Sequence, residues 1–282
     1  MYKLFVENKR GEKTELTNNP ALTIVSIDGF DPPEATINTT KIAGADGSVF
    51  NSAYANQRQI TITGVINSPA EDNRLMLYKW FKTKAPIRLY YQTESRNLYI
   101  DGYTQSIQIG YFEKKETLQI VVICPDPWLR NTETETEVIS SIVPQFEFPM
   151  DIPPEGIEFS YYNLNDEITI VNYGDVDAGA VITIHATGAV DTPKIYNSES
   201  LEYMIINTAM VAGDDIIINT IRGEKSIIRI RDGVRTVLIG DLADGSTWLQ
   251  FAPGMNKFII DANSGAENMS INLMLTDLYE GV

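Results

Sequence analysis

The chain has 282 residues, of which 43% are hydrophobic and 21% charged, a composition typical of a folded protein and not of a disordered one. No apolar run approaches the ~18 residues of a membrane span, and no apolar segment near the start precedes a cleavage site, so we expect neither a membrane anchor nor a signal peptide. One cysteine, Cys124, excludes an intrachain disulfide, and one histidine, His185, leaves little for metal chemistry.

The net charge of −16 is unevenly spread. Residues 1–130 hold 15 Lys and Arg against 14 Asp and Glu, whereas residues 131–282 hold 7 against 24. This asymmetry predicts two modules, and the acidic one would repel phosphate backbones, so we expect no specific nucleic-acid binding. Two interpretations stay open: the acidity only keeps an exposed domain soluble, or partners cover the near-neutral half.

In the first half, most segments have the composition of strands and one has that of a helix. Ser68-Pro69-Ala70-Glu71 has the pattern of a capping box with proline at the first helical position, and it opens a helix over 70–82 whose inner face carries Leu77, Trp80 and Phe81. A single helix among strands predicts a β-sandwich with one helix packed on it. The predicted strands, rich in Ile, Val, Tyr, Thr and Phe, are 2–7, 22–27, 59–66, 87–92, 97–100, 107–112 and 117–124.

A Thr-Glu run over 131–137 and a proline-rich stretch over 144–154 follow, and they predict a linker and an extended crossing segment. From residue 168 onward, short strands alternate with glycine turns, which predicts a second, all-β sandwich domain. We therefore expect a first domain over 1–130, a linker and crossing segment over 131–165, and a second domain over 166–282. The strands predicted in it are 168–172, 180–186, 193–196, 202–207, 215–219, 226–231, 247–251, 257–260 and 269–275.

The titratable residues predict no catalytic, cofactor or metal site. His185 shares a strand face with Val181 and Thr183, without a sequence cue for a nucleophile or an orienting acid, so we expect an ordinary strand histidine. Cys124 ends an apolar strand that offers no cation to activate its thiol, and packing is expected.

The densest carboxylates, Asp175-Val-Asp177 and Asp214-Asp215, adjoin glycines at strand ends, where turn formation already accounts for aspartate. The first of these segments lacks the spacing of a calcium loop. No phosphate-binding or dinucleotide motif is present.

Trp248 is the most informative single aromatic residue. Leu249 and Phe251 are predicted to face the core, so Trp248 and Gln250 would share the opposite face of a strand. An indole ring on such a face can stack on a sugar or anchor a protein partner, whereas a neighbouring loop can also cover it. Trp248 and Gln250 are therefore the candidate carbohydrate or partner contacts.

Several segments, taken in order, resemble one protein family. The turn Gly44-Ala-Asp-Gly-Ser48 followed by the strand Arg58-Gln-Ile-Thr-Ile62 resembles the amino-terminal domain of siphophage-type distal tail proteins. The closing Cys124-Pro-Asp-Pro-Trp128 comes in the same order as in that family. Val171-Asn-Tyr-Gly-Asp175 and Pro253-Gly-Met-Asn256 resemble the family's carboxy-terminal domain, so the resemblance covers nearly the whole chain.

The resemblance implies a structural and non-catalytic protein of a phage, prophage or phage-tail-like bacteriocin, assembled in the bacterial cytoplasm into the virion tail. It implies a hexameric ring of amino-terminal domains that joins the tail tube protein to the tail-tip or baseplate hub protein. The carboxy-terminal domain is expected to resemble a galectin or carbohydrate-binding module, to point outward and to contact receptor-binding or other baseplate proteins.

A cyclic ring needs a heterologous interface, for which an exposed strand edge is suited. Two segments are candidates for it: the loop over 45–57 and the tip of a hairpin over 107–118. Their candidate residues are Asp46, Ser48 and Phe50, and Glu113, Lys114 and Lys115.

Two alternatives stay open. The chain could be a carbohydrate-binding protein that recognises the host wall through its acidic domain. A secreted glycosidase is less favoured, because a signal peptide and a credible acid–base pair are both missing.

Overall fold

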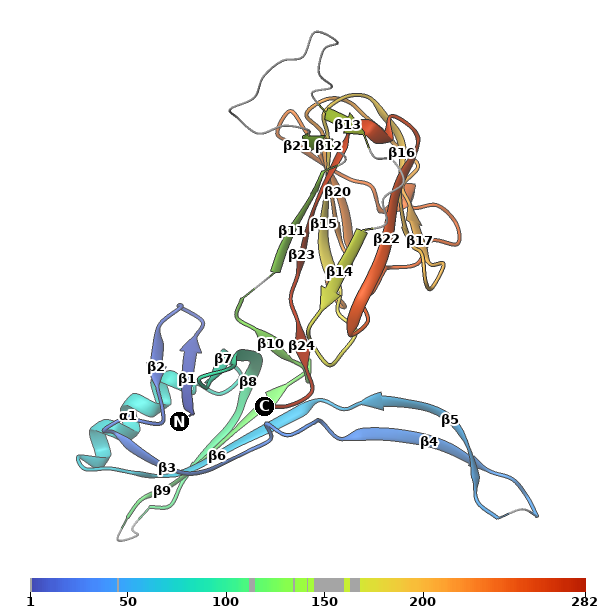
Figure 1. Cartoon of the computed structure of the whole chain (residues 1–282). Helices are drawn as coiled ribbons and strands as arrows, with labels where there is room; N and C mark the ends of the chain where they lie inside the picture. The colour runs from blue at the N-terminus through green and yellow to red at the C-terminus, as the bar shows by residue number, and fades with distance from the viewer. Residues whose placement is uncertain are drawn as a thin grey trace. The chain divides into compact units, whose positions relative to one another are not determined.

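The computed structural model describes residues 2–44, 46–111, 115–133, 135–140, 142–144, 160–162 and 168–282, with the backbone alone between 135 and 162. The chain forms two compact units (Figure 1). The first comprises Met1–Glu133 together with Leu278–Val282, and the second comprises Thr134–Asp277. Among the described residues there is one α-helix, and strands dominate both units, so the predicted mainly β class is confirmed.

The first unit is built on one antiparallel sheet with the strand order β2-β1-β7-β8-β9-β6-β3. Side chains alternate between a buried and a more exposed face, most clearly on β6. Nineteen buried residues, from these strands, the helix and the segments next to them, form one core. The strand bounds are β1 Lys3–Asn8, β2 Lys13–Glu15, β3 Leu22–Asp28, β6 Arg58–Ile66, β7 Pro86–Gln92, β8 Asn97–Ile109 and β9 Thr117–Cys124.

The predicted helix is present as α1, Ala70–Trp80, and its start differs from the prediction. Pro69 is the N-cap residue, and no side chain caps the helix, so Ser68 does not form the predicted capping box. The acidic residues Glu71 and Asp72 in the first turn instead favour the helix start electrostatically. Leu77 and Phe81 are buried in the core, as predicted.

Two further predictions for the first unit were wrong. Residues 97–100 and 107–109 belong to one 13-residue strand, β8, whose register shifts between Thr104 and Ser106, so a strand irregularity joins them. Gly110 and Tyr111 lie beyond the end of β8, and Phe112 lies outside the described residues. The loop expected over 45–57 is largely a strand, β5 (Ser48–Ala55), which pairs with β4 (Ala35–Lys41). Gly44 and Gly47, both with positive φ as predicted, lie in the turn between them.

The second unit contains two principal antiparallel sheets, which accords with the predicted sandwich. One has the order β11-β23-β15-β19-β20-β21, and the other has β14-β22-β16-β17 with β18 beside β16. Each sheet buries one face, for example Ile182 and Ile216 in the first and Ile195 and Phe258 in the second. The bounds are β11 Glu135–Ser140, β14 Ile168–Asn172, β15 Ala180–Ala186, β16 Val190–Asn197, β17 Tyr203–Ile205, β18 Ala209–Met210, β19 Asp215–Asn219, β20 Ser226–Arg231, β21 Val234–Val237, β22 Gly254–Ser264 and β23 Met269–Leu275, with a separate pair of β12 Ile142–Pro144 and β13 Ser160–Tyr162.

The chain leaves and re-enters the first unit through two paired strands. β10 (Leu129–Asn131) pairs with β8 on one side and with β24 (Leu278–Tyr279) on the other. The last five residues, which follow the second unit in the sequence, therefore belong to the first unit and add β24 to its sheet.

Candidate interaction surfaces

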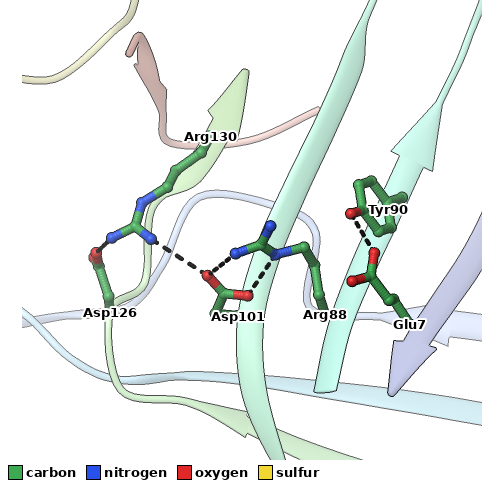
Figure 2. Close-up of polar contacts among 6 residues, drawn as sticks. All are labelled: Glu7, Arg88, Tyr90, Asp101, Asp126 and Arg130. Carbon is green, nitrogen blue, oxygen red and sulfur yellow. Dashed lines mark hydrogen bonds and ion pairs between the residues drawn. The ribbon is translucent and has the colours of Figure 1, made fainter. Parts of the chain in front are cut away.

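The outer face of the first unit carries a ladder of alternating charges (Figure 2). The register places Arg88 of β7 directly opposite Asp101 of β8, and the guanidinium donates to both carboxylate oxygens over 2.7 and 2.9 Å. Arg130 of β10 shares Asp101 at 3.4 Å and binds Asp126 at 2.6 Å. The carboxylate hydrogen bonds raise the pKa of Arg88.

Aromatic rings fill the spaces between these ion pairs. Tyr90 of β7 donates to a Glu7 carboxylate oxygen at 2.6 Å, and burial together with this hydrogen bond raises the pKa of Tyr90. The ammonium of Lys13 lies 3.5 Å from the centroid of the Tyr90 ring, and Arg88 lies over Tyr99. Because the ladder pairs its cations with acids on the same face, it is close to neutral.

The strands β4 and β5 form a ribbon that projects beyond the ends of β3 and β6 (Figure 1); we call it the arm. Its register and the strand alternation place Ala35 and Ile37 on one face with Phe50 and two further alanines, Ala53 and Ala55. Ile37 and Phe50 are 64% and 63% exposed. One face of the arm, the apolar face, is thus unpacked.

The opposite face of the arm carries Tyr54 and Val49, 57% and 48% exposed, beside polar side chains that bond to one another. Asn38 donates to Ser52 at 3.0 Å, and Asn51, the extra residue of a bulge, donates to Thr40 at 2.6 Å. A two-stranded ribbon alone is marginally stable in water. An arm that exposes large apolar side chains in this way is suited to packing against another protein surface.

The predicted contact residues of the first unit fall in two places. Asp46 lies exposed in the turn of the arm, Ser48 begins β5, and Phe50 lies on the apolar face. Lys115 is exposed in the connection between β8 and β9, while Glu113 and Lys114 lie outside the described residues. The arm therefore brings three of the six candidates together, and their part in an interface stays a prediction.

Trp248 and Gln250 do not lie on a strand. Residues 246–250 have no regular structure, and only Phe251 makes an isolated bridge, with Ala178. Leu249 and Phe251 are buried as predicted, but Gln250 turns its amide to the carbonyl of Thr220 at 3.1 Å.

The Trp248 ring is half-buried and lies 5.4 Å from the Lys225 ammonium. One ring face is thus taken by a cation of the same unit and the amide is engaged internally, so nothing in the geometry favours a sugar platform. Sugar or partner binding by these two residues stays a prediction.

The remaining titratable candidates have structural partners. His185 is exposed on β15 and its Nδ1 lies 2.7 Å from Asp215 of β19, directly opposite in the register. Cys124 is buried, and burial raises the pKa of its thiol to about 12, which leaves it unreactive at neutral pH. Within the ranges that the structure describes, no three His, Cys, Asp or Glu side chains gather as a metal site.

Asp214 gives a test of the second unit by pH. Its buried carboxylate accepts from Arg231 Nε at 2.7 Å and from the Val211 amide at 2.9 Å, and the Arg231 hydrogen bond holds the pKa of Asp214 below its ordinary value. Because the pKa of Asp214 is lower in the folded protein than in the unfolded chain, where it is about 3.9, the charged carboxylate stabilises the fold at any pH above that value. This stabilisation is lost as the pH falls through the lower pKa of the folded protein.

We expect Asp214→Asn to lower the free energy of unfolding at pH 7, and the difference from wild type to shrink between pH 4 and pH 2, measured by urea denaturation. The matched control, Asp215→Asn, changes a partly exposed carboxylate whose partner is the exposed His185, and it should cost much less at pH 7. A difference that stays constant over this pH range would show that the Asp214 charge is irrelevant.

Two protein-family models match the chain and together cover most of it. The phage tail protein RIFT-related domain matches residues 9–122, and the siphovirus-type tail component, C-terminal domain, matches residues 173–273. The chain belongs to the Dit-like family of phage distal tail proteins. This distal tail protein is thus a structural component of a phage tail, as the sequence resemblance implied. No curated protein matches it in sequence.

Solved structures show the same fold for this distal tail protein. The crystal structure of SPP1 Dit, described as a paradigm of the hub adsorption apparatus of phages that infect Gram-positive hosts, superposes with a TM-score of 0.69 at 11% identity over 99% of both chains. A chain of the phage P2 baseplate in its activated conformation with Ca matches with a TM-score of 0.56 at 13% identity over 100% of both. None of the described helices is long and apolar enough to cross a membrane.

Sequence reasoning missed two of these surfaces. The ladder did leave a signal in the sequence. Arg88 and Tyr90 are two residues apart in one predicted strand, and Tyr99 and Asp101 are two apart in or just after the next, so each pair would lie on one face of its strand. The apolar face of the arm had no such signal, since its small and polar residues have the composition of a loop.

Proposed function

We propose that this distal tail protein forms a hexameric ring through its first unit and that the ring joins the tail tube protein to the tail-tip or baseplate hub protein. One observation carries the proposal: the arm exposes an apolar face, with Ile37 and Phe50 almost two thirds accessible, that only an additional surface can bury.

A second copy of the chain is the natural occupant of the arm. A ring of identical subunits uses a heterologous interface, in which a projecting element of one subunit meets a different surface of the next. The residues 1–130, near neutral in charge, can approach their own kind without strong repulsion, whereas the acidic residues 131–282 cannot. The neutral ladder face is likewise compatible with crowding against other tail proteins and with passing DNA.

We further propose that the protein is non-enzymatic and that the second unit lies at the periphery of the ring, where its acidity keeps it solvated. We propose domain limits of 1–130 and 166–282, except that Leu278–Val282 return to the first unit. We also propose that the second domain is galectin-like and contacts other baseplate components.

Assembly gives the direct test. We expect size-exclusion chromatography with light scattering to show a species near six times 31.5 kDa, about 189 kDa, and negative-stain images to show rings with a central opening. A protein that stays monomeric at the highest attainable concentration would contradict the ring. A closed oligomer of another number would contradict the hexamer alone.

A further inference from the structure

The cations of the second unit are concentrated in one place. Between residues 134 and 277 there are 7 Lys and Arg against 22 Asp and Glu, and five of the seven lie between Arg222 and Arg235. That stretch holds two acids, Glu224 and Asp232, so it carries a local charge of +3 in a unit of net charge −15. It forms the hairpin of β20 and β21.

β21 is the terminal strand of its sheet and has β20 as its neighbour. The Leu238 amide donates to the Ile227 carbonyl at 2.9 Å, which fixes the alternation of backbone groups along the strand. Val234, Thr236 and Leu238 therefore bond toward β20, and the amide and carbonyl groups of Arg235 and Val237 face away from the sheet.

Among the described residues, the edge of β21 is short and carries the charged Arg235, but it has neither of the two backbone features that block strand addition, a bulge or a proline. Its register with β20 has no bulge, the strand has no proline, and all four side chains are exposed, with Val234 at 65% and Val237 at 70%. Native sheets commonly blunt such an edge or cover it. An open edge with exposed valines can accept a further strand.

The cations beside this edge are not all neutralised. Arg231 is held by Asp214, but no ion pair involves Arg229 or Arg235 in the part of the chain that the structure describes. The Arg229 Nε is buried without a hydrogen-bond partner. Arg229 belongs to β20 and its Nε is buried, so an incoming strand would pair a carboxylate with Arg235, the exposed cation of β21 itself.

We propose that β21 is a docking strand for an acidic polypeptide, which adds to the sheet as a further strand bonded to the backbone of Arg235 and Val237. Main-chain hydrogen bonds supply the affinity, and alternate carboxylates beside Arg235 supply the charge selection. The proposal is independent of the ring, because it concerns the second unit and a different partner chemistry.

A pair of defined peptides tests the proposal on the full-length protein. The probes are acetylated, amidated eight-residue peptides of alternating Val-Glu and alternating Val-Lys at pH 7.5. We expect saturable binding of the Val-Glu peptide, at least tenfold tighter than that of the Val-Lys peptide, with slower hydrogen exchange of the Arg235 amide.

Three variants separate strand addition from charge attraction. Val237→Pro removes an outward amide at a position where an edge strand tolerates proline, and should weaken Val-Glu binding at least tenfold. Val237→Thr keeps the amide and should bind nearly as wild type. Arg235→Glu leaves the backbone unchanged and should abolish the preference for the acidic peptide.

Three outcomes would overturn the proposal. If Val237→Pro binds the acidic peptide like wild type, binding depends on charge attraction only and no strand is added. If the two peptides bind equally, the edge does not select an acidic partner. Val237→Pro could change only the self-association of the protein, in which case a second copy occupies the edge.

Discussion

Arg58→Met should unfold the first unit at a temperature roughly 10–15 °C below wild type, which corresponds to ~3–5 kcal/mol for a buried charge network of this kind. Arg58 is 3% exposed, and its guanidinium donates to four backbone carbonyls, with distances of 2.7 Å to Pro127, 2.8 Å to Gly29, 2.6 Å to Asp31 and 2.6 Å to Glu280. Burial lowers the pKa of Arg58 from its ordinary value.

The reason for the large effect is that the four carbonyls come from separate parts of the chain. Gly29 and Asp31 follow β3, Pro127 precedes β10, and Glu280 follows β24, so one side chain fastens the last residues of the chain to the body of the first unit. Methionine fills the volume and leaves four carbonyls without this donor, each a cost of ~1–3 kcal/mol if it stays unsatisfied.

Thermal and urea denaturation followed by far-UV circular dichroism check the result, with limited proteolysis near the carboxyl terminus as a local readout. Arg88→Met is the matched control, because it makes the same exchange at a half-exposed ion pair and should cost about 1 kcal/mol or less. Equal losses in the two variants would show that the Arg58 cluster does not hold the terminus.

The arrangement around Arg58 illustrates what sequence could and could not supply. Strands that bury one face were predictable, because alternating residues or a short apolar run indicate a strand directly. Five of them have the predicted bounds: β9 (117–124), β15 (180–186), β19 (215–219), β20 (226–231) and β23 (269–275). Arg58 stood in the predicted motif Arg58-Gln-Ile, but its burial depends on carbonyls up to 222 residues away in the chain.

The strands of the arm were not predicted from the sequence, for a different physical reason. Its alanines, serines, asparagines and threonines carry no strong strand period, and both of its faces are exposed in the single chain, so no alternation of burial marks it. The segment 247–251 shows the opposite error, because a strand was predicted there and the structure has none. Leu249 and Phe251 do alternate into the core, but apart from the bridge at Phe251 and a hydrogen bond of 2.9 Å from the Thr247 amide to the Tyr203 carbonyl, the segment forms no strand ladder with the described residues.

Ile37→Asp should dissociate the proposed ring, weakening subunit association at least a hundredfold. Burying an isoleucine contributes ~1.5–3 kcal/mol, and a carboxylate in its place adds a desolvation cost, so ~3 kcal/mol or more per contact is expected. On the apolar face of the arm, Ile37 and Phe50 are the large hydrophobic side chains, with Thr39, Lys41 and Ser48 beside them, and the cross-strand neighbour of Ile37 is the small Ala53.

The matched control places the same charge on the opposite face. Asn38→Asp changes the adjacent residue, where a carboxylate can still accept a hydrogen bond from Ser52, and it should leave assembly within a fewfold of wild type. Sedimentation velocity across a dilution series measures both variants, and circular dichroism verifies that each monomer is folded.

The comparison of Ile37→Asp with Asn38→Asp separates charge from geometry. Since both variants carry the same added charge on the same strand, general repulsion between subunits would weaken them equally, and an interface on the apolar face weakens Ile37→Asp alone. Phe50→Asp, from the other strand and the same face, should then behave like Ile37→Asp. If Phe50→Asp assembles normally while Ile37→Asp does not, the contact is confined to β4, and the apolar face as a whole is not the interface.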